Sequence, residues 1–164
     1  MQITTSAVTL TVDDERVSAA FLRDHLGFRQ EMAADGFVSL SRPDAGVHIV
    51  YLRRGTTVLP EELRHRLAGG VILSFVVTDV AAEEARLRAA GAPITMPLYE
   101  QPWGERLFQI TDPNGVVIEL VEWTPGAEPT GSGPSPASQP PGGASPGEPP
   151  ADGQPPGGAS PVGQ

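Results

Sequence analysis

The order of predicted elements in the first half of this chain recurs in the second half, and this internal repeat is the strongest constraint on its fold. Thr9–Asp14 aligns with Ser74–Asp79, and each segment is a strand that ends at an acidic residue suited to cap a helix. Ala45-Gly46 aligns with Asn114-Gly115 in two later turns. The repeat, about 65 residues long, predicts a strand, a helix and three further strands in each half. We therefore expect an α+β fold in which two βαβββ modules form a curved mixed sheet around a shared cavity.

The predicted domain covers residues 1–124 and consists of the two modules and a connection. Module one spans about 4–53, the connection 54–70 and module two about 71–123. The predicted strands outside the last hairpin are 6–12, 28–32, 37–41, 47–52, 71–77 and 94–96. Helices are expected at 15–26 and 80–90, one or two helical turns at 60–67, and a loop at 98–104.

Residues 125–164 differ in composition from the rest of the chain. From Thr124 onward there is no aromatic residue, and Val162 is the one aliphatic residue larger than Ala. The sequence QPPGGASP occurs twice, at Gln139–Pro146 and Gln154–Pro161. Such a segment buries too little apolar surface to offset the entropy of ordering it, so we expect a disordered tail.

The segment Arg106–Trp123 is predicted to be a strand, a tight turn and a second strand. Asp112–Gly115 forms the turn, because Pro presets φ and the Asn and Gly that follow tolerate positive φ. Val116–Glu122 is apolar and β-branched, as in a buried strand, yet it contains Glu119. A carboxylate on a buried strand costs several kcal/mol unless it is paired. Glu119 is therefore either a ligand-contacting carboxylate or a relic acid paired with an Arg or with water.

Charge and composition exclude several classes of function. Three of the 20 acidic residues lie in the tail, which leaves the domain 17 acids against 11 arginines, a net charge of −6. This balance argues against nucleic acid as a partner and favours neutral or cationic ligands. The chain has no Cys and no Lys, which excludes thiol and Schiff-base chemistry. It shows no signal peptide and no membrane-spanning run, so we expect a cytoplasmic protein without a membrane partner.

Three motifs resemble those of the vicinal oxygen chelate superfamily. They are Leu26-Gly27-Phe28 and Ala90-Gly91 at the two helix ends, and the hairpin pattern Phe108-x-x-x-Asp112-Pro113-x-Gly115-x-x-x-Glu119-Leu120. That superfamily includes glyoxalase I, extradiol dioxygenases, fosfomycin-resistance enzymes and bleomycin-binding resistance proteins. The resemblance implies paired βαβββ modules and a homodimer, and it specifies fold better than function.

The resemblance also identifies where metal-dependent relatives place their ligands. Carried over by position, these sites are Ala7, Val50, Ile72 and Glu119, so one ligating side chain remains of four. Three protein ligands are the usual minimum for a catalytic zinc or iron ion. The alternative is a metal site in which His48 and Glu119 are the two protein ligands and water molecules complete the coordination. We expect no metal and no cofactor.

The predicted ligand-binding residues lie on strand faces that point away from the helices, or in a loop at the cavity mouth. By strand parity Phe37 and Ser39 face the cavity and Tyr51 packs toward the helix. His48 has a second interpretation as a strand residue at a sheet edge, and Trp103 as a lid over the core or a dimer contact. The full set is Phe37, Ser39, His48, Val50, Trp103, Gln109 and Glu119.

The favoured interpretation is a small-molecule-binding protein that sequesters a hydrophobic or aromatic, antibiotic-like compound without breaking a bond. The family resemblance alone suggests that this compound is a toxic natural product. The alternative is a lyase, isomerase or dioxygenase of the same superfamily, with an atypical metal site or with Glu119 or His48 as general base. A third hypothesis is a structural or regulatory module whose Pro-rich tail recruits a partner.

Overall fold

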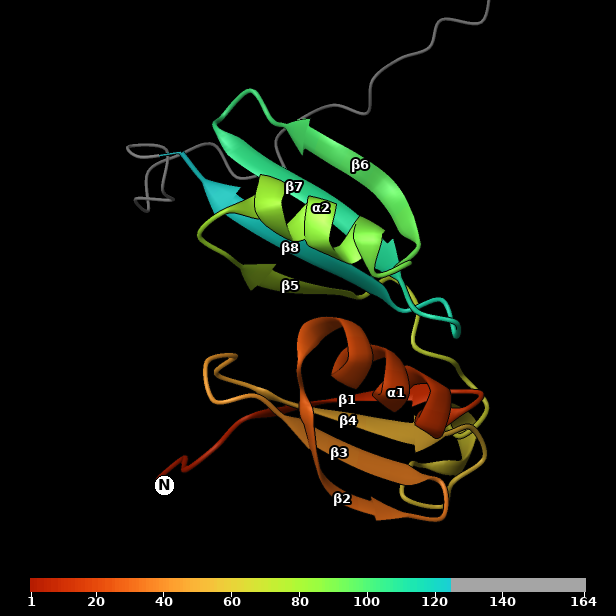
Figure 1. The fold of residues 1–164 in the computed structure, drawn as a ribbon. Helices are drawn as coiled ribbons and strands as arrows, with labels where there is room; N and C mark the ends of the chain where they lie inside the picture. The colour runs from red at the N-terminus through yellow and green to blue at the C-terminus, as the bar shows by residue number, and fades with distance from the viewer. Residues whose placement is uncertain (125–164) are drawn as a thin grey trace, which may run out of the picture. The chain divides into compact units, whose positions relative to one another are not determined.

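The computed structural model describes residues 1–124, and the predicted disordered tail at 125–164 lies outside the described residues. Module one contains β1 (Ala7–Val12), α1 (Glu15–Leu26), β2 (Arg29–Ala34), β3 (Phe37–Ser41) and β4 (His48–Arg53). Module two contains β5 (Ile72–Val76), α2 (Val80–Ala89), β6 (Ile94–Glu100), β7 (Glu105–Thr111) and β8 (Val117–Trp123). The 3-10 helix η1 (Glu61–Leu63) lies in the connection. The predicted α+β fold of two βαβββ modules is confirmed (Figure 1).

Each module forms one four-stranded mixed sheet with the same topology. The strand orders are β1-β4-β3-β2 and β5-β8-β7-β6. In each sheet the first and last strands of the module pair in parallel, and the other neighbours are antiparallel. The sequence repeat is thus a repeat of strand pairing as well as of element order.

The pairing registers place four residues side by side across each sheet. The module-one row runs across β1, β4, β3 and β2 and consists of Thr9, Val50, Ser39 and Met32. The module-two row runs across β5, β8, β7 and β6 and consists of Ser74, Glu119, Gln109 and Met96. Because the two sheets have the same topology, each residue of one row has a counterpart in the other.

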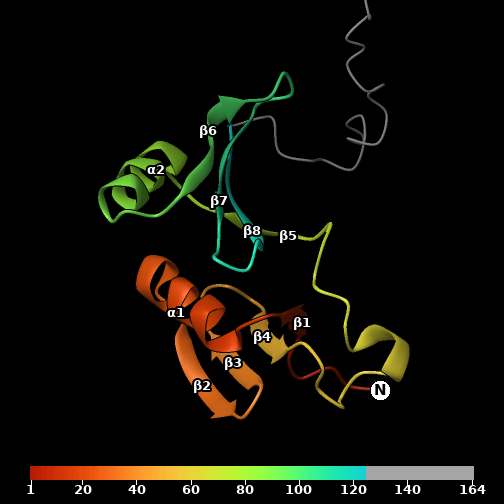
Figure 2. The same cartoon turned by 90° about the vertical axis from the view of Figure 1, so that its right-hand side faces the viewer.

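Each helix lies across one face of its own sheet (Figure 2). Asp14 caps α1 by accepting hydrogen bonds from the backbone N–H groups of Arg16 and Val17, and Asp79 caps α2 in the same way at Ala82. Gly27 ends α1 at a φ of 68°, a left-handed conformation that favours glycine. These local signals set where the helices begin and end.

The core lies between the helices and the helix-facing sides of the strands. Tyr51 is buried there, as strand parity predicted, together with Val38 and Leu40. Phe37 and Ser39 on the opposite face are partly exposed. Burying one large aliphatic side chain contributes roughly 1.5–3 kcal/mol, so this alternation fixes which face of each sheet is free for other contacts.

The β7–β8 turn of module two contacts the first turns of α1 in module one. Ser18 Oγ donates a hydrogen bond to Asp112 Oδ2, and Asn114 Nδ2 donates to Ser18 Oγ at 2.8 Å and to the Asp14 carbonyl at 2.7 Å. Asp112 is buried, and its other oxygen accepts from the backbone N–H groups of Asn114 and Val116. The turn therefore joins the modules as well as reversing the chain.

Two predicted element bounds are wrong. Residues 98–100, expected in a loop, belong to β6, because Tyr99 and Glu100 pair with Leu107 and Arg106 of β7. Strand β2 begins at Arg29 and extends to Ala34, beyond the predicted end at 32. In both places pairing with a neighbouring strand extends an element whose own sequence is a weak strand signal.

No helix within residues 1–124 is long and apolar enough to cross a membrane.

Candidate functional site

Glu119 stands in the middle of the module-two row with a hydrogen-bond donor on each side. Its Oε1 accepts from Ser74 Oγ at 3.0 Å, and its Oε2 accepts from Gln109 Nε2 at 2.9 Å. The flanking strands place both donors, since Ser74 and Gln109 are the direct register partners of Glu119 on β5 and β7. The carboxylate is partly exposed, and these two bonds fix its position between β5 and β7.

The hydrogen bonds within this cluster determine what it can offer a ligand. Ser74 donates its only hydroxyl hydrogen to Glu119, so towards a ligand its oxygen can only accept. Gln109 directs its amide nitrogen to Glu119 and keeps its carbonyl oxygen and one N–H. Each carboxylate oxygen retains a further lone pair. The remaining capacity of the cluster is mostly that of acceptors, so it suits a ligand group with several N–H donors.

Apolar side chains flank the cluster on β5. Ile72 and Val76 lie two residues to either side of Ser74, so all three point to the same face of the sheet. The exposed fractions are 51% for Ile72 and 71% for Val76, which is unusually open for aliphatic side chains on a strand. An acceptor cluster beside apolar surface is the general composition of a small-molecule site.

The module-one candidates lie on the matching face of the other sheet. Ser39 pairs with Val50, Phe37 with Leu52, and His48 with Ala7. No hydrogen bond or ion pair within residues 1–124 joins any of these candidates to Glu119. The structure thus brings together Gln109 and Glu119 of the predicted set, and the predicted shared cavity stays a prediction.

Phe37 also lines a hollow of 370 Å³ beside the chain that follows β4. Arg53 and Thr57 line the same hollow, which does not include Glu119.

Trp103 lies in the turn between β6 and β7. Its indole Nε1–H donates to Glu105 Oε2 at 2.9 Å, so the one polar group of the ring is already engaged. What remains for a ligand is the flat surface of the ring.

The residues at the positions where relatives place metal ligands do not fit a divalent ion. Ala7, Val50 and Ile72 carry hydrocarbon side chains with no atom that can coordinate a metal. Within residues 1–124 no three His, Cys, Asp or Glu side chains lie close enough together to hold one. We therefore treat Glu119 as a hydrogen-bonding group and not as a metal ligand.

Sequence reasoning missed Ser74 as a partner of Glu119. The two residues are far apart in the sequence, and their contact depends on the parallel register of β5 and β8. The repeat contained a usable signal, since Ser74 aligns with Thr9 and both occupy the first position of their row.

Comparisons with known proteins place the chain among relatives of the same architecture. The model of the Glyoxalase/Bleomycin resistance protein/Dioxygenase superfamily matches residues 4–120. A glyoxalase/bleomycin resistance protein/dioxygenase from Nocardioides is 24% identical over 79% of this chain and 89% of its own, with a TM-score of 0.64.

Two further solved structures are similar. Lactoylglutathione lyase from Agrobacterium tumefaciens is 21% identical over 74% of this chain and 94% of its own, with a TM-score of 0.60. TioX from Micromonospora sp. ML1 is 25% identical over 74% of this chain and 100% of its own, with a TM-score of 0.58. The comparison with curated proteins gives no match.

Proposed function

This chain belongs to the glyoxalase/bleomycin resistance protein/dioxygenase superfamily, and from that premise we propose that it binds and sequesters a small molecule without a metal ion. The ligand carries a cationic or N–H-rich group on an aromatic or hydrophobic body, as many antibiotic-like natural products do. The cation lies at Glu119, and the apolar body lies along Ile72 and Val76.

The hydrogen bonding of Glu119 is the observation that carries this proposal. Two neutral donors orient the carboxylate, and they leave acceptor capacity facing the ligand. The net charge of −6 on residues 1–124, from 17 acids and 11 arginines, also favours the approach of a cation. Metal-dependent relatives place metal ligands at four positions, and three of these are apolar in this chain. This supports the binding of a small molecule rather than metal-assisted chemistry.

Tryptophan fluorescence tests the proposal directly, because Trp103 and Trp123 both lie in module two. The full chain is titrated with a panel of aromatic antibiotics, half of them with an amine or amidine and half without, and metal content is measured on the same sample. We expect saturable binding by cationic members alone, at a stoichiometry unrelated to metal content.

Other results would change the function assigned. A stoichiometric divalent ion that is lost on Glu119→Ala refutes metal-free binding. Turnover of an α-keto thiol adduct or a catechol, abolished by Glu119→Gln, would instead support the lyase, isomerase or dioxygenase alternative, with Glu119 as general base.

We also propose that the protein acts as a homodimer. Strand β5 lies at the edge of its sheet and exposes Ile72 and Val76. Edge strands with exposed aliphatic side chains are favourable surfaces for pairing with another chain. A second copy would cover part of this surface and enclose the ligand.

A further inference from the structure

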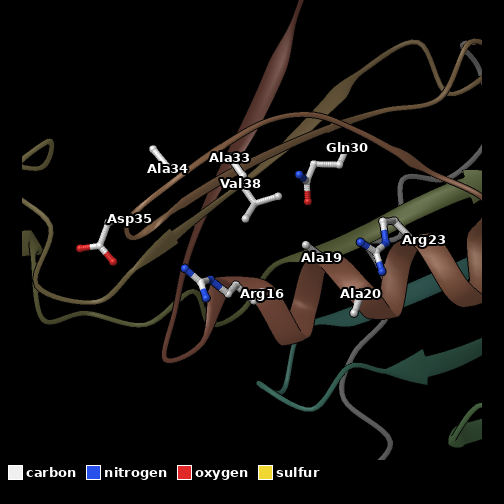
Figure 3. Close-up of a pocket in the computed structure, with 9 residues that line it drawn as sticks. All are labelled: Arg16, Ala19, Ala20, Arg23, Gln30, Ala33, Ala34, Asp35 and Val38. Carbon is white, nitrogen blue, oxygen red and sulfur yellow. The ribbon is translucent and has the colours of Figure 1, made fainter.

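A groove separates α1 from the edge strand β2 in module one, with a volume of 630 Å³ (Figure 3). Arg16 and Arg23 line its helix side, Gln30 lines its strand side, and the buried Val38 lies beneath it. Four small side chains account for the open space between the two walls: Ala19, Ala20, Ala33 and Ala34.

Module two fills the corresponding space with a polar bridge. Glu84 follows the N-cap of α2 at the same distance in sequence as Ala19 follows the N-cap of α1. Its Oε1 accepts hydrogen bonds from the backbone N–H of Leu98 on β6 at 3.3 Å and from Arg88 Nη2 at 2.7 Å. Glu84 thus ties helix to edge strand, and the alanine in module one leaves the groove open.

The arginines of the groove differ from their module-two counterpart in having free donors. Arg88 is hydrogen-bonded to Glu84, whereas Arg23 occupies the same helix position in module one without such a bond. The nearest carboxylate oxygens lie 3.8 Å from Arg23, on Asp24, and 3.9 Å from Arg16, on Glu15. Within residues 1–124 neither guanidinium makes a side-chain hydrogen bond, so both can serve a ligand.

The one carboxylate that lines the groove is already engaged. Asp35 accepts a hydrogen bond from Arg53 at 2.7 Å, and this bond lowers the pKa of Asp35. Its charge is therefore balanced by Arg53, and it does not compete for Arg23 at the other end of the groove (Figure 3).

We propose that this groove is a second ligand site, which binds a small organic anion. A sulfonate, carboxylate or phosphate group would accept N–H bonds from Arg16 and Arg23, because guanidinium offers donors only. The apolar part of the ligand would lie on the alanines and Val38, in a volume typical of small-molecule pockets. The site is independent of Glu119 and has the opposite charge preference.

The experiment is a titration of the full chain with the fluorescent anion anilinonaphthalene sulfonate. Arg16→Gln combined with Arg23→Gln should weaken binding roughly tenfold, because two charge-assisted contacts are lost at a partly exposed site. Ala33→Leu should weaken it as well without changing charge, since Ala33 pairs with Val38 and points to the same side of the sheet.

A matched double variant, Arg29→Gln with Arg66→Gln, removes the same charge from exposed residues outside the groove and should bind like the wild type. Thermal unfolding of every variant checks that the fold is retained. The proposal is overturned if the wild type does not bind the probe, or if both double variants bind it equally. It is also overturned if Glu119→Gln, rather than the groove variants, abolishes binding, because the probe then lies at the other site.

Discussion

The two modules share one topology and place different chemistry on it. In the module-two row a carboxylate is held between a hydroxyl and an amide, whereas its counterpart in the module-one row is Val50 between Thr9 and Ser39. The contrast reverses between the helix and the edge strand. Within residues 1–124 the two arginines of the module-one groove make no side-chain hydrogen bond, whereas Arg88 of module two is hydrogen-bonded to Glu84. The two modules thus share their backbone pairing but present different surfaces.

The turns between the last two strands differ in the same way. Asp112 of module two is buried and accepts hydrogen bonds from Ser18, Asn114 and Val116, so it helps to join the modules. Asp44, in the corresponding turn of module one, is exposed and pairs with Arg42. An acidic residue of this turn thus joins the modules in module two, whereas the acidic residue of the corresponding turn in module one lies at the surface.

The largest expected effect comes from breaking the inter-module turn. Asp112→Ala leaves Ser18 and two backbone N–H groups without their acceptor, and we expect a loss of about 3 kcal/mol in the free energy of unfolding. Urea denaturation followed by circular dichroism measures this. Asp44→Ala is the matched control and should leave the midpoint nearly unchanged; equal losses in the two variants would contradict the contrast.

The second prediction concerns the open edge of module two. Val76→Glu places a charge on the exposed face of β5 and should shift the chain from dimer to monomer, with a dissociation constant raised at least about tenfold. Sedimentation at several concentrations measures the shift. Val58→Glu, at an exposed site in the connection, should leave the dimer–monomer equilibrium unchanged. A wild type that is monomeric at all concentrations would rule out this role of β5.

A third variant tests the orientation of Glu119. Ser74→Ala removes one of its two donors and should weaken binding of a cationic aromatic probe by roughly threefold, the value of one modest hydrogen bond. Thr9→Val changes the same position of the module-one row and should have no effect. If the two variants behave alike, the difference between the rows does not determine binding.

The last effect appears only at high pH. Burial raises the pKa of Tyr51 above its usual value of 10.0, and the hydroxyl has no hydrogen-bond partner within residues 1–124. The unfolded chain therefore loses this proton first, and stability present below pH 10 declines as the pH rises further, by up to about 1.4 kcal/mol per unit.

Tyr51→Phe should remove this part of the decline while changing stability at neutral pH by less than about 1 kcal/mol. The variant then has a side chain without a hydroxyl at this position, as module two does, where Leu120 occupies the matching position. Urea denaturation at a series of pH values measures the slope, with the exposed Tyr99→Phe as control. A slope unchanged by Tyr51→Phe would contradict this account of its burial.

The sequence predicted what depends on local signals and on the repeat. Caps at Asp14 and Asp79, the stop at Gly27 and the turn at Asp112–Gly115 follow from residue types that favour one backbone conformation. Strand parity then separated core residues such as Tyr51 from residues on the free face such as Ser39.

Features that depend on contacts between distant segments were not predictable in this way. The bond from Ser74 to Glu119 requires a parallel register, and that from Ser18 to Asp112 requires the packing of two modules. The groove arises where alanines from α1 and β2 meet, and small residues on separate elements give no pattern in a linear sequence.

The central claim is that an oriented carboxylate in module two binds cationic molecules without a metal ion. Calorimetric titration of the full chain with an aromatic diamidine, in the presence of a chelator, tests it most directly. We expect binding that the chelator leaves unchanged and that Glu119→Gln weakens about tenfold, or roughly 1.4 kcal/mol, while Glu100→Gln, which removes the same charge elsewhere, does not. Binding that the chelator abolishes, or equal affinities for the two variants, would contradict the claim.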